Sequence, residues 1–171
     1  MKGIPRLLIG LLTAVMSLSP ALADEPEAVL GYWATEDSIL EVATAGESLS
    51  MRVVALENPV YTEGEEHGPP GAVRVDVNNP DAALRDRPIL GLELLSDYAF
   101  SKDRWGGKIY DPQSGKLYSS TMWSEDGSLQ MRGYIGVSFL GRTQTFAPVA
   151  DCGPKIVALL QTTSFAQASC D

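Results

Sequence analysis

Short stretches of alternating or continuous apolar residues, each closed by turn residues, recur along most of this chain, and helical periodicity is scarce. Such stretches are typical of β-strands, because successive side chains of a strand point to opposite faces of its sheet. Many short strands at this spacing predict an all-β fold, an antiparallel barrel or sandwich of about eight to nine strands. The nine candidate strands are residues 29–33, 39–43, 48–56, 73–77, 89–95, 107–110, 116–124, 128–137 and 142–149.

Two consecutive hairpins are the clearest local signal. The turn at 111–115 contains Pro112 and Gly115, and the turn at 124–127 ends on Gly127. These residue types supply the fixed or positive φ that tight reversals need. We expect the second turn to have a three-residue loop. That register gives the cross-strand pairs Ser124–Ser128, Met122–Gln130, Ser120–Arg132 and Tyr118–Tyr134.

This register divides the second hairpin into two faces. The more apolar face is the natural core side, and it carries Leu117, Ser119, Thr121, Trp123, Leu129, Met131, Gly133 and Ile135. The other face carries Tyr118, Ser120, Met122, Gln130, Arg132 and Tyr134, and two interpretations of it stay open. In the first, the face is exposed and Arg132 stacks on a tyrosine ring. In the second, the face lines a cavity.

The cavity interpretation assigns a role to each of five residues. Arg132 would bind an anionic group of a ligand, because a guanidinium pairs well with carboxylate or phosphate. Tyr118 and Tyr134 would stack on the ligand or donate hydrogen bonds to it. Met122 and Trp105 would form an apolar wall. The sequence therefore gives a ligand-binding hypothesis for this hairpin.

The first residues have the pattern of a removable export signal. Lys2 and Arg6 precede a mostly apolar run at 7–18, and Ala21-Leu22-Ala23 has the small-x-small form that signal peptidase cleaves. We expect a signal peptide at 1–23, one domain at 24–171, a periplasmic location and no membrane span after cleavage. An uncleaved anchor is the alternative, although the apolar run is short for a membrane span.

The chain contains two cysteines, Cys152 and Cys170, both near its end. In an oxidising compartment two such thiols are expected to form a structural disulfide, which would tie down the C-terminal tail at 150–171. We expect no metal site and no cofactor, because His67 is the only histidine and no Cys-x-x-Cys spacing occurs.

The charge balance bears on the partners of the chain. There are 22 Asp and Glu residues against 13 Lys and Arg, a net charge of −9, and such a surface repels phosphate, which argues against nucleic acid as a partner. Four glutamates fall within 57–71, together with Asn58-Pro59 and Pro69-Pro70. This composition predicts a long acidic loop.

Two segments have helical signals. Asn79-Pro80-Asp81 has the pattern of a helix start, with Asn79 as N-cap and Pro80 at the first position, and predicts a short helix over about 80–87. The tail at 155–165 has a mixed apolar pattern that fits a helix held by the disulfide.

Four motifs also occur in a characteristic order: Gly31-Tyr32-Trp33; Asn79-Pro80-Asp81 with Leu84 to Pro88 and Gly91; Trp105 to Pro112 with Ser114 to Lys116 and Tyr118; and Leu129 to Gly136 with Leu140 to Thr143. Together they resemble the exported bacterial family called domain of unknown function 2147, over residues 29–149. The resemblance implies a lipocalin-like (calycin) antiparallel β-barrel and a periplasmic location. It implies no established activity, so no functional residues can be transferred.

A further resemblance concerns the closed end of the barrel. Gly31-Tyr32-Trp33 at the start of the first strand, with Arg142 on the last strand, is similar to the lipocalin closure in which an arginine packs over a tryptophan ring. This implies a structural role for Trp33 and Arg142, through a cation–π contact and hydrogen bonds to carbonyl groups at the chain ends.

Two functions from different classes are consistent with these features. The first is a non-enzymatic binding module for a small, partly apolar ligand, because a barrel of about eight strands has room for one such molecule. The alternative is a protein-binding or inhibitory module of the cell envelope that acts through the acidic loop at 57–71.

An enzyme is not expected, because no Gly-x-Ser-x-Gly motif occurs and the cysteines are expected to pair. Asp111, beside Tyr110 and Tyr118 and with Arg132 two strands away, has two interpretations, an acid–base site and a role in a turn. The turn is favoured, since Asp accepts backbone N–H groups in such positions. Asp37 and Asp76 are interpreted in the same way, as turn or cap residues.

Overall fold

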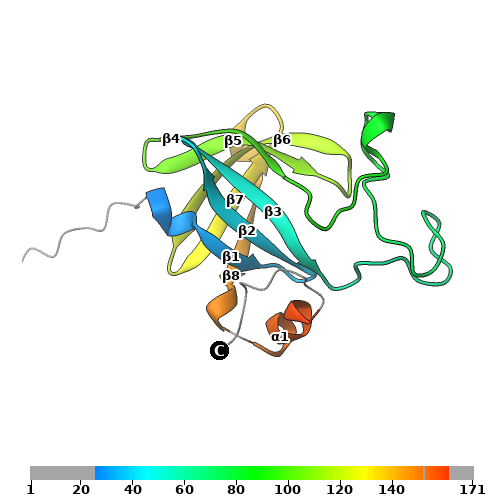
Figure 1. Ribbon diagram of the computed structural model, residues 1–171. Helices are drawn as coiled ribbons and strands as arrows, with labels where there is room; N and C mark the ends of the chain where they lie inside the picture. The colour runs from blue at the N-terminus through cyan, green and yellow to red at the C-terminus, as the bar shows by residue number, and fades with distance from the viewer. Residues whose placement is uncertain (1–25, 152, 162–171) are drawn as a thin grey trace, which may run out of the picture.

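Eight β-strands form one antiparallel sheet that curls into a nearly closed barrel (Figure 1). The computed structural model describes residues 26–151 and 153–161. The strands are β1 (Gly31–Ala34), β2 (Ser38–Ala45), β3 (Ser48–Leu56), β4 (Leu95–Ser101), β5 (Arg104–Asp111), β6 (Lys116–Glu125), β7 (Ser128–Tyr134) and β8 (Arg142–Pro148). The short helices are η1 (Pro26–Val29), η2 (Ala82–Leu84), η3 (Ser138–Leu140), η4 (Val149–Asp151) and α1 (Pro154–Leu160).

The strands follow an up-and-down order in which β8 returns to β1, so the sheet order is β3-β2-β1-β8-β7-β6-β5-β4. The gap between β3 and β4 is bridged by residues 91–94. The Leu94 N–H donates to the Met51 carbonyl at 2.8 Å, and the Val53 N–H donates to the Leu92 carbonyl at 3.1 Å. The Tyr110 N–H donates to the Leu94 carbonyl at 2.8 Å. This segment therefore links β3 to β5 and almost completes the barrel wall.

One end of the barrel is filled and closed. Inward-facing apolar side chains pack there in a core that includes Trp33, Val42, Leu49, Met51, Tyr98, Trp105, Met122, Leu129 and Met131. Helix η1 lies across this end, where the Trp33 indole N–H donates to the Val29 carbonyl and the Trp105 indole N–H donates to the Pro26 carbonyl, both at 2.8 Å. Both indoles are buried with their polar N–H satisfied, which an apolar core requires.

A second apolar cluster lies outside the barrel, under α1. Ile39 and Val54 face outward from β2 and β3, and Ile156 and Leu159 of α1 cover them. This confirms the helical part of the expected tail, since the structure describes that helix up to Leu160. No helix in the described part of the chain is long and apolar enough to span a membrane.

The prediction of an antiparallel barrel is confirmed, and seven of the nine predicted strands overlap real ones by several residues, while an eighth, 89–95, overlaps β4 at Leu95 alone. The strand predicted at 73–77 is wrong, because these residues belong to the long connection 57–94 and make only isolated bridges, and the strand predicted at 89–95 is misplaced, since only Leu95 belongs to a strand. The rest of strand β4, Ser96 to Ser101, was not predicted. Asp97, at a φ of +57°, and a register shift between Ser96 and Ala99 interrupt its alternation.

The helix predicted at 80–87 is shorter than expected and begins later. Its N-cap is Asp81, whose carboxylate accepts the Ala83 N–H at 3.0 Å, and not Asn79. Only the single 3₁₀ turn η2 forms. The Asn79 Oδ1 does accept the Asp81 N–H, as an N-cap would, but the helical turn starts only after Asp81, and Asn79 Nδ2 donates to Asp76.

The predicted register of the second hairpin is wrong by one residue. Glu125 pairs with Ser128, which leaves a two-residue loop of Asp126 and Gly127 at φ values of +51° and +75°. Two positive φ values in succession are what a type I′ turn needs. The shift pairs Met122 with Met131, and the interior receives Ser120 and Met122 from β6 with Leu129 and Met131 from β7. Neither predicted face of the hairpin is therefore intact.

The predicted contact of Arg142 with Trp33 is also wrong. Trp33 pairs with Pro148 at the far end of β8, whereas Arg142 begins that strand opposite Gly133. Six residues of extended strand separate the two positions along β8, about 20 Å. Trp33 keeps its structural role through Val29, while Arg142 lies at the opposite end of the barrel. The predicted disulfide of Cys152 with Cys170 and the predicted signal peptide at 1–23 fall outside the described residues.

Candidate ligand-binding cavity

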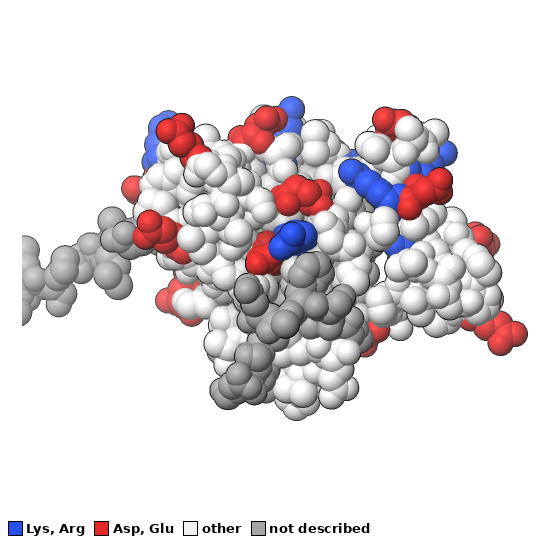
Figure 2. Space-filling view, viewed as in Figure 1, with Lys and Arg blue, Asp and Glu red and all other residues white. Residues whose placement is uncertain are grey.

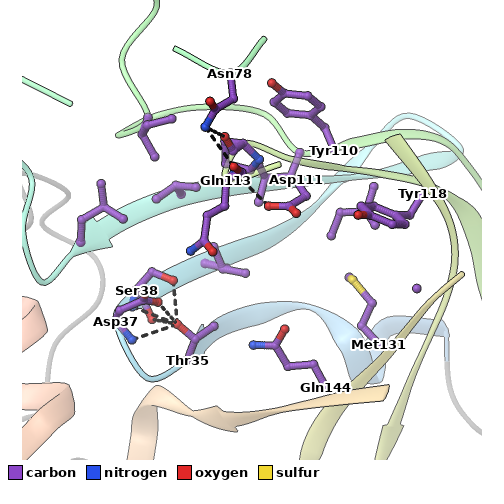
Figure 3. Close-up of a pocket in the computed structure, with 18 of the residues that line it drawn as sticks. Thr35, Asp37, Ser38, Asn78, Tyr110, Asp111, Gln113, Tyr118, Met131 and Gln144 are labelled. Atoms are coloured by element: carbon purple, nitrogen blue, oxygen red, sulfur yellow. Dashed lines mark hydrogen bonds between the residues drawn. The ribbon is translucent and has the colours of Figure 1, made fainter. Parts of the chain in front are cut away.

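The other end of the barrel opens into a cavity of about 1140 Å³. Its mouth is framed by the connections 35–37, 57–94, 112–115 and 135–141, which all lie at the end opposite η1. Figure 3 shows side chains from several of these connections arranged around the opening. The barrel interior is thus divided into a packed half and an open half.

The wall of the cavity is mainly apolar. It is formed by inward-facing side chains of the strands and of the 89–94 segment, namely Leu40, Val53, Leu94, Ile109, Met131 and Phe146. Most of these residues also belong to the packed core, so the packed core forms the floor of the cavity. Such a wall favours the apolar part of a ligand, because burial removes its surface from water.

One side of the rim is the turn between β1 and β2. The Thr35 hydroxyl oxygen accepts the N–H of Ser38 at 2.9 Å and that of Asp37 at 3.2 Å, and the hydroxyl donates to the Asp37 carboxylate at 2.9 Å. This confirms the interpretation of Asp37 as a turn residue. These polar groups lie across the opening from the β5–β6 turn in Figure 3.

The opposite side of the rim is the turn between β5 and β6. The Asp111 carboxylate accepts the Gln113 N–H at 3.0 Å and the Ser114 hydroxyl at 2.6 Å, so its predicted role in a turn is confirmed. Asn78, from the long connection, donates from Nδ2 to the Gln113 carbonyl at 2.9 Å and to the Pro112 carbonyl at 3.3 Å. Asn78 therefore joins the long connection to this turn and fixes that part of the rim.

A buried polar network holds the long connection against the barrel. The Asp76 carboxylate is fully buried, and the Tyr110 hydroxyl donates to its Oδ1 at 2.7 Å. Its Oδ2 accepts from Asn79 Nδ2 at 2.7 Å and from Arg87 Nε and Nη2 at 3.0 and 2.9 Å. Four donors compensate the cost of burying this charge. Asp76 is therefore the anchor of the network and not a simple turn or cap residue.

Burial raises the pKa of both Tyr98 and Tyr110 to about 12, and for Tyr110 the hydrogen bond to the Asp76 carboxylate adds to the effect. Because these pKa values exceed the value of 10 in the unfolded chain, the stability they contribute is complete below pH 10 and is lost as the pH rises towards 12. We expect a spectrophotometric titration to show a late-ionising fraction of the six tyrosines. Loss of that fraction in Tyr98→Phe and Tyr110→Phe checks the assignment, and a single midpoint near pH 10 for all tyrosines would contradict it.

The acidic loop at 57–71 folds around Tyr61, which is buried. The Arg74 guanidinium lies over the Tyr61 ring at 5.1 Å and donates to the Glu65 carboxylate at 2.8 Å, and this hydrogen bond lowers the pKa of Glu65. Glu57, Glu63 and Glu66 are exposed. The Glu65 carboxylate is therefore bound by Arg74, and the other three glutamates of the loop face solvent. Figure 2 shows acidic residues spread over the visible face and not collected into one patch.

The five predicted ligand-binding residues are separated by the structure. Tyr118 and Tyr134 both line the cavity, although they are not cross-strand partners, since Tyr134 pairs with Ser119. Trp105 and Met122 pair with each other in the packed core, below the cavity. Arg132 is not among the residues that line the cavity: it donates to the carbonyls of Ser138 and Phe139 at 2.8 and 3.1 Å and thereby supports η3.

Sequence reasoning missed the Asp76 network and the apolar wall residues Ile109 and Leu94. Three members of the network, Asn79, Arg87 and Tyr110, stand within the motifs that carry the family resemblance. The presence of these polar residues in the motifs is the sequence feature that could have indicated the network. Within the residues that the structure describes, no group of three or more His, Cys, Asp or Glu side chains is placed to hold a metal ion.

The fold and the cavity define a lipocalin-like β-barrel. Among solved structures, the chain is similar to protein HP1028 from the human pathogen Helicobacter pylori, which belongs to the lipocalin family, with a TM-score of 0.58, 20% sequence identity, and coverage of 80% of this chain and 91% of that one. The chain belongs to the DUF2147 family, described as uncharacterized proteins conserved in bacteria, whose family model matches residues 31–147. No curated protein matches the chain.

Proposed function

We propose that this protein is a non-enzymatic binding protein that holds one small amphipathic molecule in the open half of its barrel. The observation that carries the proposal is the cavity of about 1140 Å³, whose wall is apolar and whose rim is polar. Sites for small molecules have this combination, because apolar burial supplies affinity and a few polar groups fix orientation. Lipocalin-like barrels supply the fold-level analogy for this function.

The proposal places the apolar part of the ligand against Ile109, Met131 and Phe146 and its polar part at the rim. Tyr118 and Tyr134 are in position to stack on the ligand or to donate hydrogen bonds near the rim. Arg142 lines the cavity as well and takes over the role of anion-binding residue that the sequence assigned to Arg132. The expected place of action is the periplasm, as the N-terminal signal pattern predicts.

The first test is native mass spectrometry of protein purified gently from the producing cells. A reproducible mass above that of the chain supports the proposal and gives the mass of the ligand. The second test uses 1-anilinonaphthalene-8-sulfonate, a fluorescent amphipathic anion, as a probe that does not depend on recovery of the natural ligand.

We expect Ile109→Trp to weaken the affinity for this probe about tenfold or more, because the indole occupies space that the ligand needs. Lys108→Trp is the matched control. It adds the same side chain at the neighbouring position of β5, which is exposed, and should leave the affinity unchanged. Fluorescence titration measures both variants. Equal affinity of Ile109→Trp and the unmodified protein would show that the probe does not bind in the cavity.

A further inference from the structure

The rim of the cavity carries charges of both signs. The side chains that line it include three carboxylates and two guanidinium groups, those of Asp37, Glu57, Asp111, Arg74 and Arg142. An anionic ligand alone would favour a rim with an excess of basic groups, and this rim has an excess of acidic ones. The charges therefore restrict which head group a ligand can have.

The two arginines of the rim differ in what their charge is used for. The Arg74 guanidinium donates to the Glu65 carboxylate at 2.8 Å, and Glu65 does not line the cavity. Arg142 forms no salt bridge with any residue in the described part of the chain. A ligand at the rim therefore meets three carboxylates and one guanidinium whose charge is not already compensated.

The place of Arg142 follows from the alternation of β8. Phe146 is buried inside the barrel, and Gln144 and Arg142 lie two and four residues before it, so all three lie on the inward face of the strand. The cross-strand partner of Arg142 is Gly133, which has no side chain. This leaves space beside the guanidinium for an anionic group of the ligand.

Across the barrel, the alternation of β5 and β6 places a carboxylate near an aromatic ring. Asp111 lies two residues after the wall residue Ile109, and Tyr118 is the β6 partner of Ile109. The Ser114 hydroxyl donates to Asp111 at 2.6 Å and lies 3.4 Å from the Tyr118 hydroxyl. Figure 3 shows Asp111 and Tyr118 on the same side of the opening. A carboxylate with a nearby ring suits an ammonium group, which both attract.

The other two carboxylates belong to one side of the opening. The Glu57 N–H donates to the Asp37 carbonyl at 2.8 Å, so the two residues are in contact, and both are exposed. Figure 3 shows Asp37 across the opening from Asp111. Carboxylates on two sides of one opening give a field that attracts a cation and opposes a purely anionic head group.

We propose that the ligand has a zwitterionic head group. Its anionic group binds Arg142, and its ammonium group binds between the Asp111 carboxylate and the Tyr118 ring, in the field of Asp37 and Glu57. This inference rests on the proposed binding function and adds the chemical class of the ligand, which is a zwitterionic amphipath with its apolar part against the cavity wall.

The test compares four amphiphiles that share a decyl chain and differ in head group: decylphosphocholine, decyl sulfate, decyltrimethylammonium and decyl maltoside. Isothermal titration calorimetry, at low ionic strength and below the critical micelle concentrations, measures each dissociation constant. We expect decylphosphocholine to bind the unmodified protein about tenfold more tightly than each of the other three. Exposed ion pairs are weak singly and strongest at low salt, so the preference comes from several acting together.

Two variants separate the contributions of the two charges. Arg142→Gln should weaken the binding of decylphosphocholine about tenfold and strengthen that of decyltrimethylammonium, because a positive charge is removed. Asp37→Asn/Glu57→Gln/Asp111→Asn should bring decylphosphocholine and decyl sulfate to equal affinity. The new amide oxygens can still accept the hydrogen bonds of the turns, and thermal unfolding checks that each variant is folded.

The matched control is Glu47→Gln/Asp103→Asn/Asp126→Asn. It removes the same number of negative charges from exposed residues in the β2–β3, β4–β5 and β6–β7 turns, which lie at the closed end of the barrel. None of the three residues lines the cavity. The preference for decylphosphocholine should persist in this control if the carboxylates of the rim, and not the net charge, determine it.

The inference is overturned if decyl sulfate or decyltrimethylammonium binds the unmodified protein as tightly as decylphosphocholine does. It is also overturned if the preference survives the triple substitution at the rim or disappears equally in the closed-end control. If 1-anilinonaphthalene-8-sulfonate binds and none of the decyl amphiphiles does, the zwitterionic head group is wrong and the binding function stands. If neither that probe nor any decyl amphiphile binds, the binding function itself fails.

Discussion

Asp76→Ala is expected to lower the free energy of unfolding by about 2–4 kcal/mol. The substitution removes the acceptor of four hydrogen bonds and leaves the Arg87 guanidinium, the Tyr110 hydroxyl and the Asn79 amide without their shared partner. The expected loss is smaller than that for a fully buried ion pair, because the Arg87 side chain is 36% exposed and can regain water. Urea denaturation followed by tryptophan fluorescence measures it.

Asp81→Ala is the matched control for this prediction. Asp81 is exposed and its carboxylate caps η2 through the Ala83 N–H, so its loss should cost only about 1 kcal/mol. Limited proteolysis should show faster cleavage within 72–90 for Asp76→Ala, because the network fixes that segment to the barrel. If both substitutions lower the free energy of unfolding equally, the Asp76 network contributes no more stability than a single exposed helix cap.

The fold class could be predicted because strand alternation is a local property. Leu40 and Val42 on β2, or Leu49, Met51 and Val53 on β3, alternate inward with period two, and their neighbours in the sequence show it. The ladder β8–β1 that closes the barrel involves only Trp33 and Ala34. That pairing joins the two ends of the domain, so the family resemblance and not local pattern indicated a closed barrel.

Register was the weaker part of the prediction. Glu125-Asp126-Gly127 fits either a three-residue or a two-residue loop, and the choice depends on whether Asp126 adopts a positive φ. A shift of one residue moves every side chain of β7 to the other face. The predicted register therefore paired Arg132 with Ser120, on one face with Tyr118, and both the stacking and the cavity interpretations depended on that face. In the structure Arg132 instead supports the connection 135–141.

The long connection could not be predicted from its own sequence. Residues 73–77 look like a strand because Val73, Val75 and Val77 alternate with polar residues. This alternation does not come from a sheet. It places Asp76 in a buried network with Tyr110 of β5 and with Arg87. Such contacts join segments that are far apart in the sequence, so no local pattern encodes them.

Gly107→Ala is expected to lower the free energy of unfolding by about 2–3 kcal/mol. Gly107 lies on β5 opposite Ser120, where the buried Tyr98 ring packs against its backbone. An added Cβ would lie 2.4 Å from Tyr98 Cδ2 and 2.8 Å from the Ser96 carbonyl oxygen. The methyl group must displace this ring, whose hydroxyl is hydrogen-bonded to Ser120 at 2.6 Å, or the β4 backbone beside it.

Gly106→Ala is the control, one residue earlier on the same strand. A Cβ there would meet nothing closer than 3.8 Å, and its backbone φ lies outside the left-handed region. The substitution should therefore be neutral, or stabilising by up to about 1 kcal/mol through the loss of unfolded-state entropy. Urea denaturation of both variants measures the difference. Equal stabilities would contradict the prediction, because they would mean that the Tyr98 ring can move at little cost in free energy. The closed half of the barrel would then be deformable, and the cavity could extend into it.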